Sequence, residues 1–186
     1  MTPVLRTERL VLRDWAENDR VPFAQLNADP EVMEHFPSAL DRAGSDAFVE
    51  RIQAHFADRG FGLWAVEAHG EFIGFTGLAV PRFHVGWMDQ REQPVVEVGW
   101  RLRRSAWGSG YATEAARAAL DFAFTELGRE EVVSFTVVEN TRSRAVMERL
   151  GMRLLTTYDH PIDGGPALPS VCYLLTRAEH VPLETR

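Results

Sequence analysis

Two glycines in the middle of the chain have the spacing of a loop that binds a phosphate group. The segment Trp107-Gly108-Ser109-Gly110-Tyr111-Ala112 follows a strand-like run, Val95 to Leu102, and leads directly into a helix-like run that begins at Thr113. Such a turn aims successive backbone N–H groups and the positive end of the helix at one point, where an anion is stabilised. Glycine has no Cβ, so phosphate oxygens can approach the backbone. The segment therefore predicts an anion-binding loop, and Arg103 and Arg104 add positive charge beside it.

Taken alone, this loop leaves other interpretations open. It is one residue short of a dinucleotide fingerprint, with Thr113 where a third glycine or alanine is expected. It also lacks the lysine of a P-loop, because the basic residues of this chain are all arginines. A structural turn without any ligand is the remaining alternative.

A second block makes the pattern more specific. It runs from Ser134 to Met152 and contains Asn140 and Ser143. Together with the first block and with Phe72-Ile73-Gly74-Phe75-Thr76-Gly77-Leu78, it resembles the GNAT superfamily of acetyl-CoA-dependent N-acetyltransferases, in particular the RimJ/RimL-like branch. The resemblance covers about Leu5 to Leu175.

The resemblance implies both a fold and a cosubstrate site. The fold is a single α/β (α+β) domain over residues 1–186, with three layers and a mixed central sheet of about seven strands flanked by helices. A splay between the fourth and fifth strands, Val95–Leu102 and Val132–Val138, would accept the pantetheine arm of acetyl-CoA. The implied cofactor-binding residues are Trp100, Leu102, Arg103, Arg104, Trp107, Gly108, Ser109, Gly110, Tyr111, Ala112, Thr113, Asn140 and Ser143. Asn140 could instead cap the following helix, and the ring of Tyr111 could pack behind the loop.

For catalysis the sequence favours direct attack of a neutral amine on the thioester. A free primary amine has a pKa near ~10 and must lose a proton first. Glu97 is the candidate base, since burial among the valines of its strand would raise its pKa. The alternatives are an outward-facing side chain or an ion pair with an arginine. A backbone N–H near Trp100 could stabilise the developing oxyanion.

The chain departs from the family pattern at Met147, where many members have a tyrosine that protonates the departing thiolate. Ser143 is the candidate substitute, and the thiolate could also leave without an acid. The acceptor side is expected near His35-Phe36-Pro37 and Asp159-His160-Pro161, where Asp159 and Asp163 would favour a cationic amine. A protein N-terminus and a small-molecule amine both stay open as acceptors.

Hydrophobic periodicity predicts the elements that position these residues. Strands are expected over Val4–Leu12, Phe61–Glu67, Glu71–Val80, Val95–Leu102, Val132–Val138, Met152–Tyr158 and Leu168–Thr176. Helices are expected from Asn18-Asp19 to Asp29-Pro30 and over Ala43–Asp58, Thr113–Leu127 and Arg142–Leu150. The segment Pro81–Pro94 is expected to be a loop whose Phe83, Trp87 and Met88 either pack on the domain or line a ligand.

Composition limits the function classes. The net charge of −7 opposes nucleic-acid binding, and the six scattered histidines predict no metal site. Cys172 lies in a strand-like run, which favours packing over a catalytic thiol. No stretch is apolar enough to span a membrane, so we expect a cytoplasmic protein, with a homodimer left open. A non-catalytic acyl-CoA-binding module and a nicotinamide-dependent oxidoreductase are the rival functions.

Overall fold

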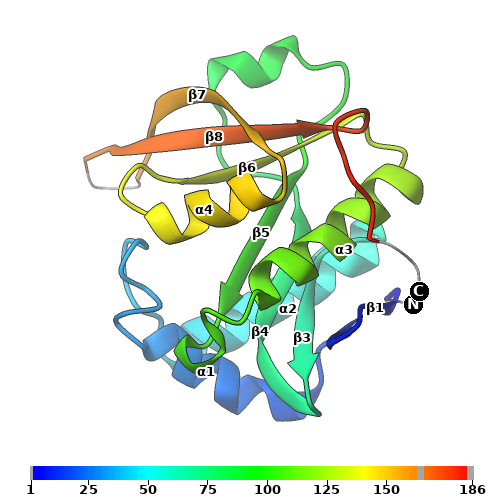
Figure 1. Ribbon diagram of the computed structural model, residues 1–186. Helices are drawn as coiled ribbons and strands as arrows, with labels where there is room; N and C mark the ends of the chain where they lie inside the picture. The colour runs from blue at the N-terminus through cyan, green and yellow to red at the C-terminus, as the bar shows by residue number, and fades with distance from the viewer. Residues whose placement is uncertain (1, 163–165, 184–186) are drawn as a thin grey trace.

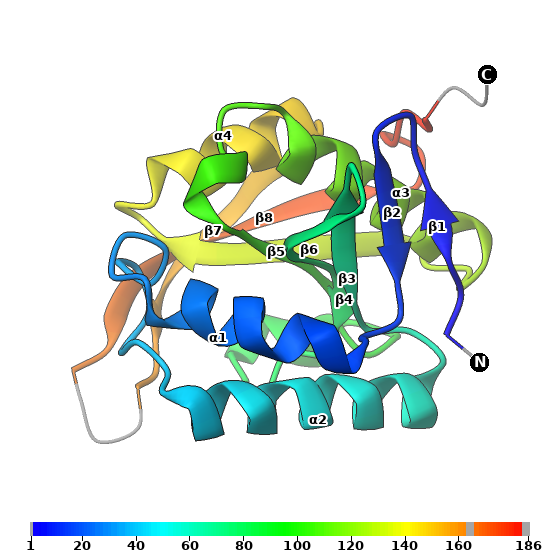
Figure 2. The ribbon, with the colours of Figure 1, turned by 90° about the horizontal axis from the view of Figure 1, so that it is seen from below.

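The computed structural model describes residues 2–162 and 166–183 and arranges them in three layers. A mixed eight-stranded sheet forms the middle layer, in the order β1-β2-β3-β4-β5-β6-β8-β7. Helices α1 (Arg20–Ala28) and α2 (Arg42–Arg59) cover one face, and α3 (Tyr111–Thr125) and α4 (Thr141–Arg149) cover the other (Figure 1, Figure 2). This arrangement confirms the three-layer α/β domain expected from the sequence.

The sheet has one strand more than the seven expected. The run Val4–Leu12 forms two antiparallel strands, because the backbone turns at Thr7, whose hydroxyl accepts the Leu10 N–H at 3.0 Å. The later strands agree with the sequence to within a few residues. The bounds are β1 Leu5–Arg6, β2 Leu10–Arg13, β3 Leu63–Ala68, β4 Glu71–Ala79, β5 Glu97–Leu102, β6 Glu131–Val137, β7 Arg153–His160 and β8 Leu168–Thr176.

Side-chain caps and left-handed glycines set the ends of the helices. Asp41 caps α2 by accepting the Gly44 N–H at 2.7 Å, and Gly60 ends that helix with a φ of 74°. Asn18-Asp19 was expected to supply the capping side chains of α1, but Asp19 makes no cap hydrogen bond to that helix. Its carboxylate accepts the Ala16 N–H at 2.8 Å and pairs with Arg13 at 2.7 Å. Short 3-10 helices lie at Glu17–Asp19 (η1), Gly86–Gln90 (η2) and Arg104–Ala106 (η3).

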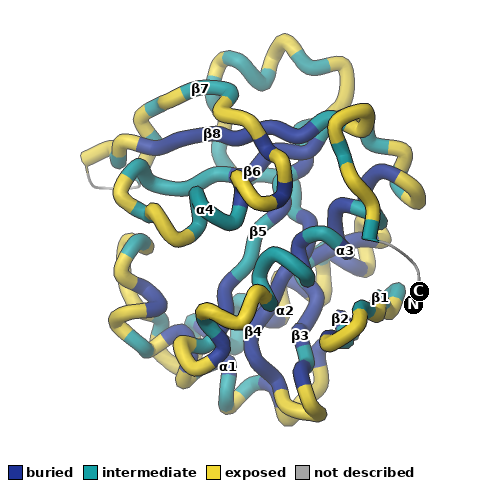
Figure 3. The backbone as a smooth tube through the Cα atoms, in the orientation of Figure 1, coloured by how far each residue is buried: buried dark blue, intermediate teal, exposed yellow. Residues whose placement is uncertain are grey.

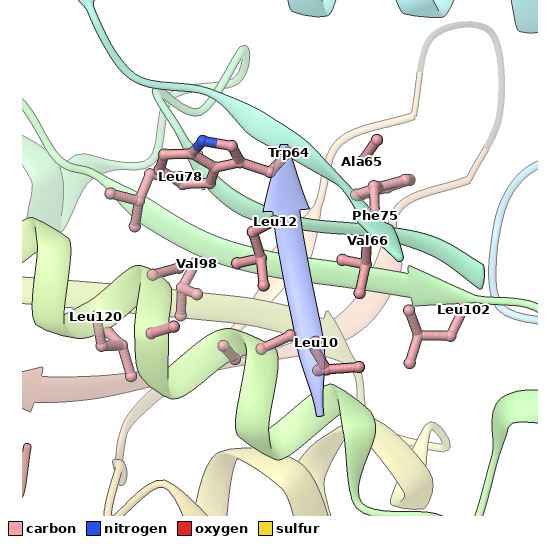
Figure 4. Close-up of a cluster of buried hydrophobic side chains, with 14 of the residues drawn as sticks. Leu10, Leu12, Trp64, Ala65, Val66, Phe75, Leu78, Val98, Leu102 and Leu120 are labelled. Carbon is pink, nitrogen blue, oxygen red and sulfur yellow. The ribbon is translucent and has the colours of Figure 1, made fainter. Parts of the chain in front are cut away.

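The core joins the sheet to the helices on both faces. Its centre contains Leu10 and Leu12 of β2, Trp64 of β3 and Leu120 of α3, all at most 2% exposed (Figure 4). The β4 and β8 strands are buried along most of their length (Figure 3). The central strands therefore have a fixed position on which a site can be built.

Two neighbouring strands of this sheet diverge. In the described residues β5 and β6 are parallel and share one register pair, Glu97 with Val133, after which they separate (Figure 1). The adjacent pairs β4–β5 and β6–β8 keep full ladders. The splay expected between Val95–Leu102 and Val132–Val138 is therefore confirmed.

Candidate active site

The loop between β5 and α3 exposes a series of backbone donors. Gly108 and Gly110 have φ angles of 76° and 81°, which favour glycine, and Gly110 is the N-cap residue of α3. None of the N–H groups of residues 108–113 donates to a described residue. The first turn of a helix has no intrahelical acceptors, so these groups suit the oxygens of an anion.

Arg9 of the first hairpin holds this loop in place. Its guanidinium donates to the Ser109 carbonyl at 2.9 Å and to the Glu114 carboxylate at 2.7 Å, and lies 4.7 Å from the centre of the Tyr111 ring. Desolvation alone would raise the pKa of Glu114, but hydrogen bonds from Thr7 and Arg9 outweigh it and lower that pKa. Sequence reasoning missed Arg9, because its contact with the loop spans about a hundred residues of chain.

A cavity of about 690 Å³ opens beside the loop. It is lined by most of the cofactor-binding residues expected from the sequence, namely Trp100, Leu102, Trp107, Gly108, Gly110, Tyr111, Ala112, Thr113, Asn140 and Ser143. Three expected residues do not line it. Arg103 pairs with Glu71 at 2.7 Å, Arg104 pairs with Glu31, and the Ser109 carbonyl accepts from Arg9.

The gap between β5 and β6 contains backbone groups that do not pair with a neighbouring strand. Arg103 donates to Ile73 at 2.8 Å, so the odd-numbered residues of β5 bond β4, and Trp100 and Leu102 turn their N–H and C=O groups toward β6. By the same alternation, the backbone N–H and C=O groups of Phe135 in β6 point toward β5. The Leu102 carbonyl accepts the Trp107 indole N–H at 2.8 Å. The gap therefore offers a polar edge of sheet to an extended ligand.

The N-terminus of α4 lies at the other wall of the cavity. The Asn140 side chain accepts the Ser143 N–H at 3.1 Å, so Asn140 caps α4 and lines the cavity at the same time. Ser143 also lines a second cavity. Met147, one turn further along α4, is 1% exposed and lines that second cavity with its side chain.

The second cavity has a volume of about 310 Å³ and adjoins the first. His35, Phe36, Trp100, Arg101 and Ser143 line both. The acceptor segment expected at His35-Phe36-Pro37 lies here, as does His160. Asp159 is exposed in β7 and lines neither cavity, and Asp163 lies outside the described residues.

Glu97 lines the second cavity and is half-buried. Burial raises the pKa of its carboxyl group to about 7. No hydrogen bond or ion pair joins this carboxylate to a described side chain, so the alternative of an arginine ion pair does not apply within that part of the chain. A carboxyl group with this pKa can accept a proton near neutral pH.

Tyr158 was not predicted as part of the site, but it lines the second cavity together with His160, which was expected on the acceptor side. The Tyr158 hydroxyl lies 3.3 Å from His160 Nδ1, and both side chains line the second cavity. Burial, and then the charges of Cys172 and Glu97, raise the pKa of Tyr158, and burial lowers the pKa of His160. The strand expected to end at Tyr158 extends through His160, so Tyr158 and His160 both face the second cavity.

The long loop and the cysteine have packing roles. The Phe83 ring lies 5.0 Å from that of Phe135 and 4.4 Å from that of His160, so the loop packs on the sheet and lines neither cavity. Cys172 is fully buried, and burial raises the pKa of its thiol to about 12. Within residues 2–162 and 166–183 there is no cluster of three or more potential metal ligands, and no helix could cross a membrane.

Comparison with known proteins places this arrangement in a family. Residues 9–153 match the model of the acetyltransferase (GNAT) domain. FsC-acetyl coenzyme A-N(2)-transacetylase of Aspergillus fumigatus is 34% identical over 98% of this chain and 80% of its own length. A GNAT-family acetyltransferase from Bacillus anthracis superposes with a TM-score of 0.78 at 24% identity, over 95% of this chain and 100% of its own.

The solved structures also include the branch suggested by the sequence. Mycobacterium smegmatis RimJ, in complex with CoA-disulfide, superposes with a TM-score of 0.73 at 20% identity, over 95% of this chain and 87% of its own. The family match covers more than half of the chain, and the fold agrees throughout. The chain therefore belongs to the GNAT family of acetyltransferases and has RimJ/RimL-like relatives.

Proposed function

We propose that this protein transfers the acetyl group of acetyl-CoA to a primary amine. The observation that carries the proposal is the meeting of two cavities at the gap between β5 and β6. One cavity is lined by the two-glycine loop, and the other contains a carboxyl group with a pKa of about 7. The name of the Aspergillus relative, which contains both acetyl coenzyme A and an N(2) position, supports the same reaction.

The residues of the first cavity fit acetyl-CoA. The free N–H groups of residues 108–113 would receive the pyrophosphate, and the backbone groups of Trp100 and Leu102 would pair with the pantetheine amides. Phe135, which lines the second cavity, offers its backbone groups from the opposite side of the gap. Asn140 would contact the same arm from the end of α4. Acetyl-CoA supplies an acetyl thioester, which is the activated group of the reaction.

Glu97 would act on the acceptor. The ammonium form of the acceptor gives a proton to the Glu97 carboxylate, and the neutral nitrogen then forms the C–N bond as the C–S bond breaks. The nitrogen loses a second proton and the CoA thiolate takes one up, so the products are the amide and the CoA thiol. The backbone N–H of Trp100 faces the gap and can donate to the oxygen that gains negative charge. Ser143, which lines both cavities, would protonate the departing thiolate, since Met147 has no proton to donate.

Turnover tests the proposal. Thiol release from acetyl-CoA would be measured with a panel of amines, in the wild type and in Glu97→Gln. We expect release with at least one amine and a loss of rate on the order of 10²–10⁴-fold in the variant. Unchanged turnover in Glu97→Gln would remove the base assignment.

Two rivals predict different results. Binding of CoA without acetylation of any amine would identify a non-catalytic acyl-CoA-binding module. Thermal stabilisation by NAD and not by CoA would identify a nicotinamide-dependent oxidoreductase.

A further inference from the structure

Arg101 is a buried cation at the point where the two cavities meet. It is 9% exposed and lines both cavities from β5. Its guanidinium donates to the Asn27 side-chain oxygen at 2.6 Å and lies 4.0 Å from the centre of the Phe36 ring. The ring centres of Phe75 and Phe48 lie 5.4 and 5.7 Å from the same guanidinium carbon. Its immediate surroundings are therefore aromatic rings and one neutral amide.

The charge of Arg101 has no counter-ion among the described residues. None of their carboxylates forms an ion pair with it, and its Nε atom is buried without a hydrogen-bond partner. The Asn27 side-chain NH₂ group donates in turn to the Ser45 hydroxyl at 2.9 Å, and that group is also neutral. A buried cation without an anion is costly to a fold. Burial lowers the pKa of Arg101 to about 10, so the group stays protonated at neutral pH.

Arg101 and Glu97 share one face of β5. They are four residues apart on a strand, so both side chains point to the same side, with Cα atoms about 13 Å apart. Gly99 lies between them, and a Cβ built on it would meet no atom within 4 Å. All three residues line the second cavity. The cavity thus has an acid-base group at one end, a cation at the other and an open floor between them.

We propose that Arg101 binds a carboxylate of the acceptor, so that the substrate class is an aminocarboxylate. Its amine would lie at Glu97, its carboxylate at Arg101, and the connecting atoms over Gly99. This inference rests on the proposed acetyl transfer. A guanidinium matches a carboxylate in shape and charge, and the Nε atom of Arg101 has no hydrogen-bond partner among the described residues. The phosphates of CoA have separate donors in the loop at residues 108–113.

Matched acceptors test this assignment. The probes are ω-aminocarboxylates of increasing chain length, each paired with its own primary amide, with acetyl-CoA held at saturation. The wild type should favour one or more carboxylates over their amides by about 10- to 100-fold in kcat/KM, mainly through KM. Arg101→Gln should remove that preference by lowering the carboxylate rate and leaving the amide rate within about twofold.

Two further variants serve as controls. Arg101→Lys keeps the positive charge and should retain part of the preference, and it also replaces Arg101→Gln if the latter does not fold. Arg59→Gln removes a charge from the exposed end of α2, where Arg59 pairs with Asp58, and should leave the preference unchanged. CoA affinity and melting temperature of each variant would show that the first cavity is intact.

The outcomes separate the inference from the proposed function. Equal rates with carboxylates and amides in the wild type, or an equal loss of both in Arg101→Gln, would overturn the inference alone. Higher kcat/KM with aminosulfonates or aminophosphonates than with the matching aminocarboxylates would overturn the assignment of a carboxylate as the bound anion. If no amine is acetylated, the proposed function fails, and calorimetry with N-acetylated aminocarboxylates then decides whether Arg101 binds the anion.

Discussion

Glu97 shows how the position of one residue gives it a chemical property. Its neighbours in sequence are valines, and its side chain enters a cavity lined mostly by apolar groups. Desolvation favours the neutral carboxyl and raises its pKa from 4.5 to about 7. The same shift that makes Glu97 a useful base must reduce the stability of the fold.

The sign of this effect can be worked out from the two pKa values. Between pH 4.5 and about 7 the unfolded chain has released the Glu97 proton and the folded chain retains it, so stability falls as pH rises. The full shift corresponds to about 3 kcal/mol, and partial solvation of the side chain makes this an upper bound. Glu97→Gln should therefore be more stable than the wild type at pH 8 and equally stable at pH 4.

Denaturant unfolding at these two pH values measures the difference. The rate should follow the same ionisation, with wild-type kcat/KM rising with pH up to about 7. A stability difference that is the same at both pH values would show that the Glu97 carboxyl is not perturbed in the folded state.

At the scale of elements, the two-glycine loop combines backbone geometry with ligand binding. Gly108 has a φ of 76°, and a Cβ built on it would meet no atom within 4 Å. A substitution there adds conformational strain without a steric clash. Gly60, at the end of α2, has a φ of 74° and the same open surroundings.

The two glycines give a matched pair of variants. Gly108→Ala and Gly60→Ala should each lose about 1 kcal/mol of unfolding free energy, because the left-handed region is unfavourable for alanine. Gly108→Ala alone should also weaken CoA binding, since Gly108 lines the first cavity. Urea unfolding and calorimetry with CoA measure the two effects. Equal CoA affinity in both variants would contradict a role of this loop in binding.

The elements also show what the sequence can and cannot predict. The hairpin of β3 and β4 and the helix α3 follow from periodicity, and the splayed pair of strands follows from the family resemblance. The turn at Thr7 was missed because it lies inside an alternating apolar run. Arg9 and Arg101 entered the site through hydrogen bonds between distant segments, and Tyr158 through the cavity that β7 shares with β5 and β6. No local pattern reports such contacts.

At the scale of the whole molecule, the sheet consists of two halves with a weak junction. One register pair and the Ser134 hydroxyl, which donates to the Val98 carbonyl at 2.9 Å, join β5 to β6 within the described residues. A ligand that pairs with both strands would complete the sheet. Binding to the folded state alone stabilises it by about 2.7 kcal/mol at a hundredfold excess over Kd.

Hydrogen exchange can locate this stabilisation. The amides of Trp100, Leu102 and Phe135 face the gap and should exchange more slowly when CoA is added. The amides of β3, a strand that has neighbours on both sides in β2 and β4, serve as the internal control. Protection that is spread evenly over the sheet would argue against binding in the gap.

The positions of the tryptophans give the protein an optical signal of its own. Trp100 and Trp107 line the first cavity, whereas Trp15 and Trp64 are buried in the core at 6% and 0% exposure. An adenine nucleotide with a long thiol arm that enters the cavity would change the environment of the first two indoles and leave the core pair unaffected. Occupancy of the cavity could thus be followed by intrinsic fluorescence without any label. The indole N–H of Trp107 donates to the Leu102 carbonyl, so a ligand that disturbs this hydrogen bond would change the emission of Trp107.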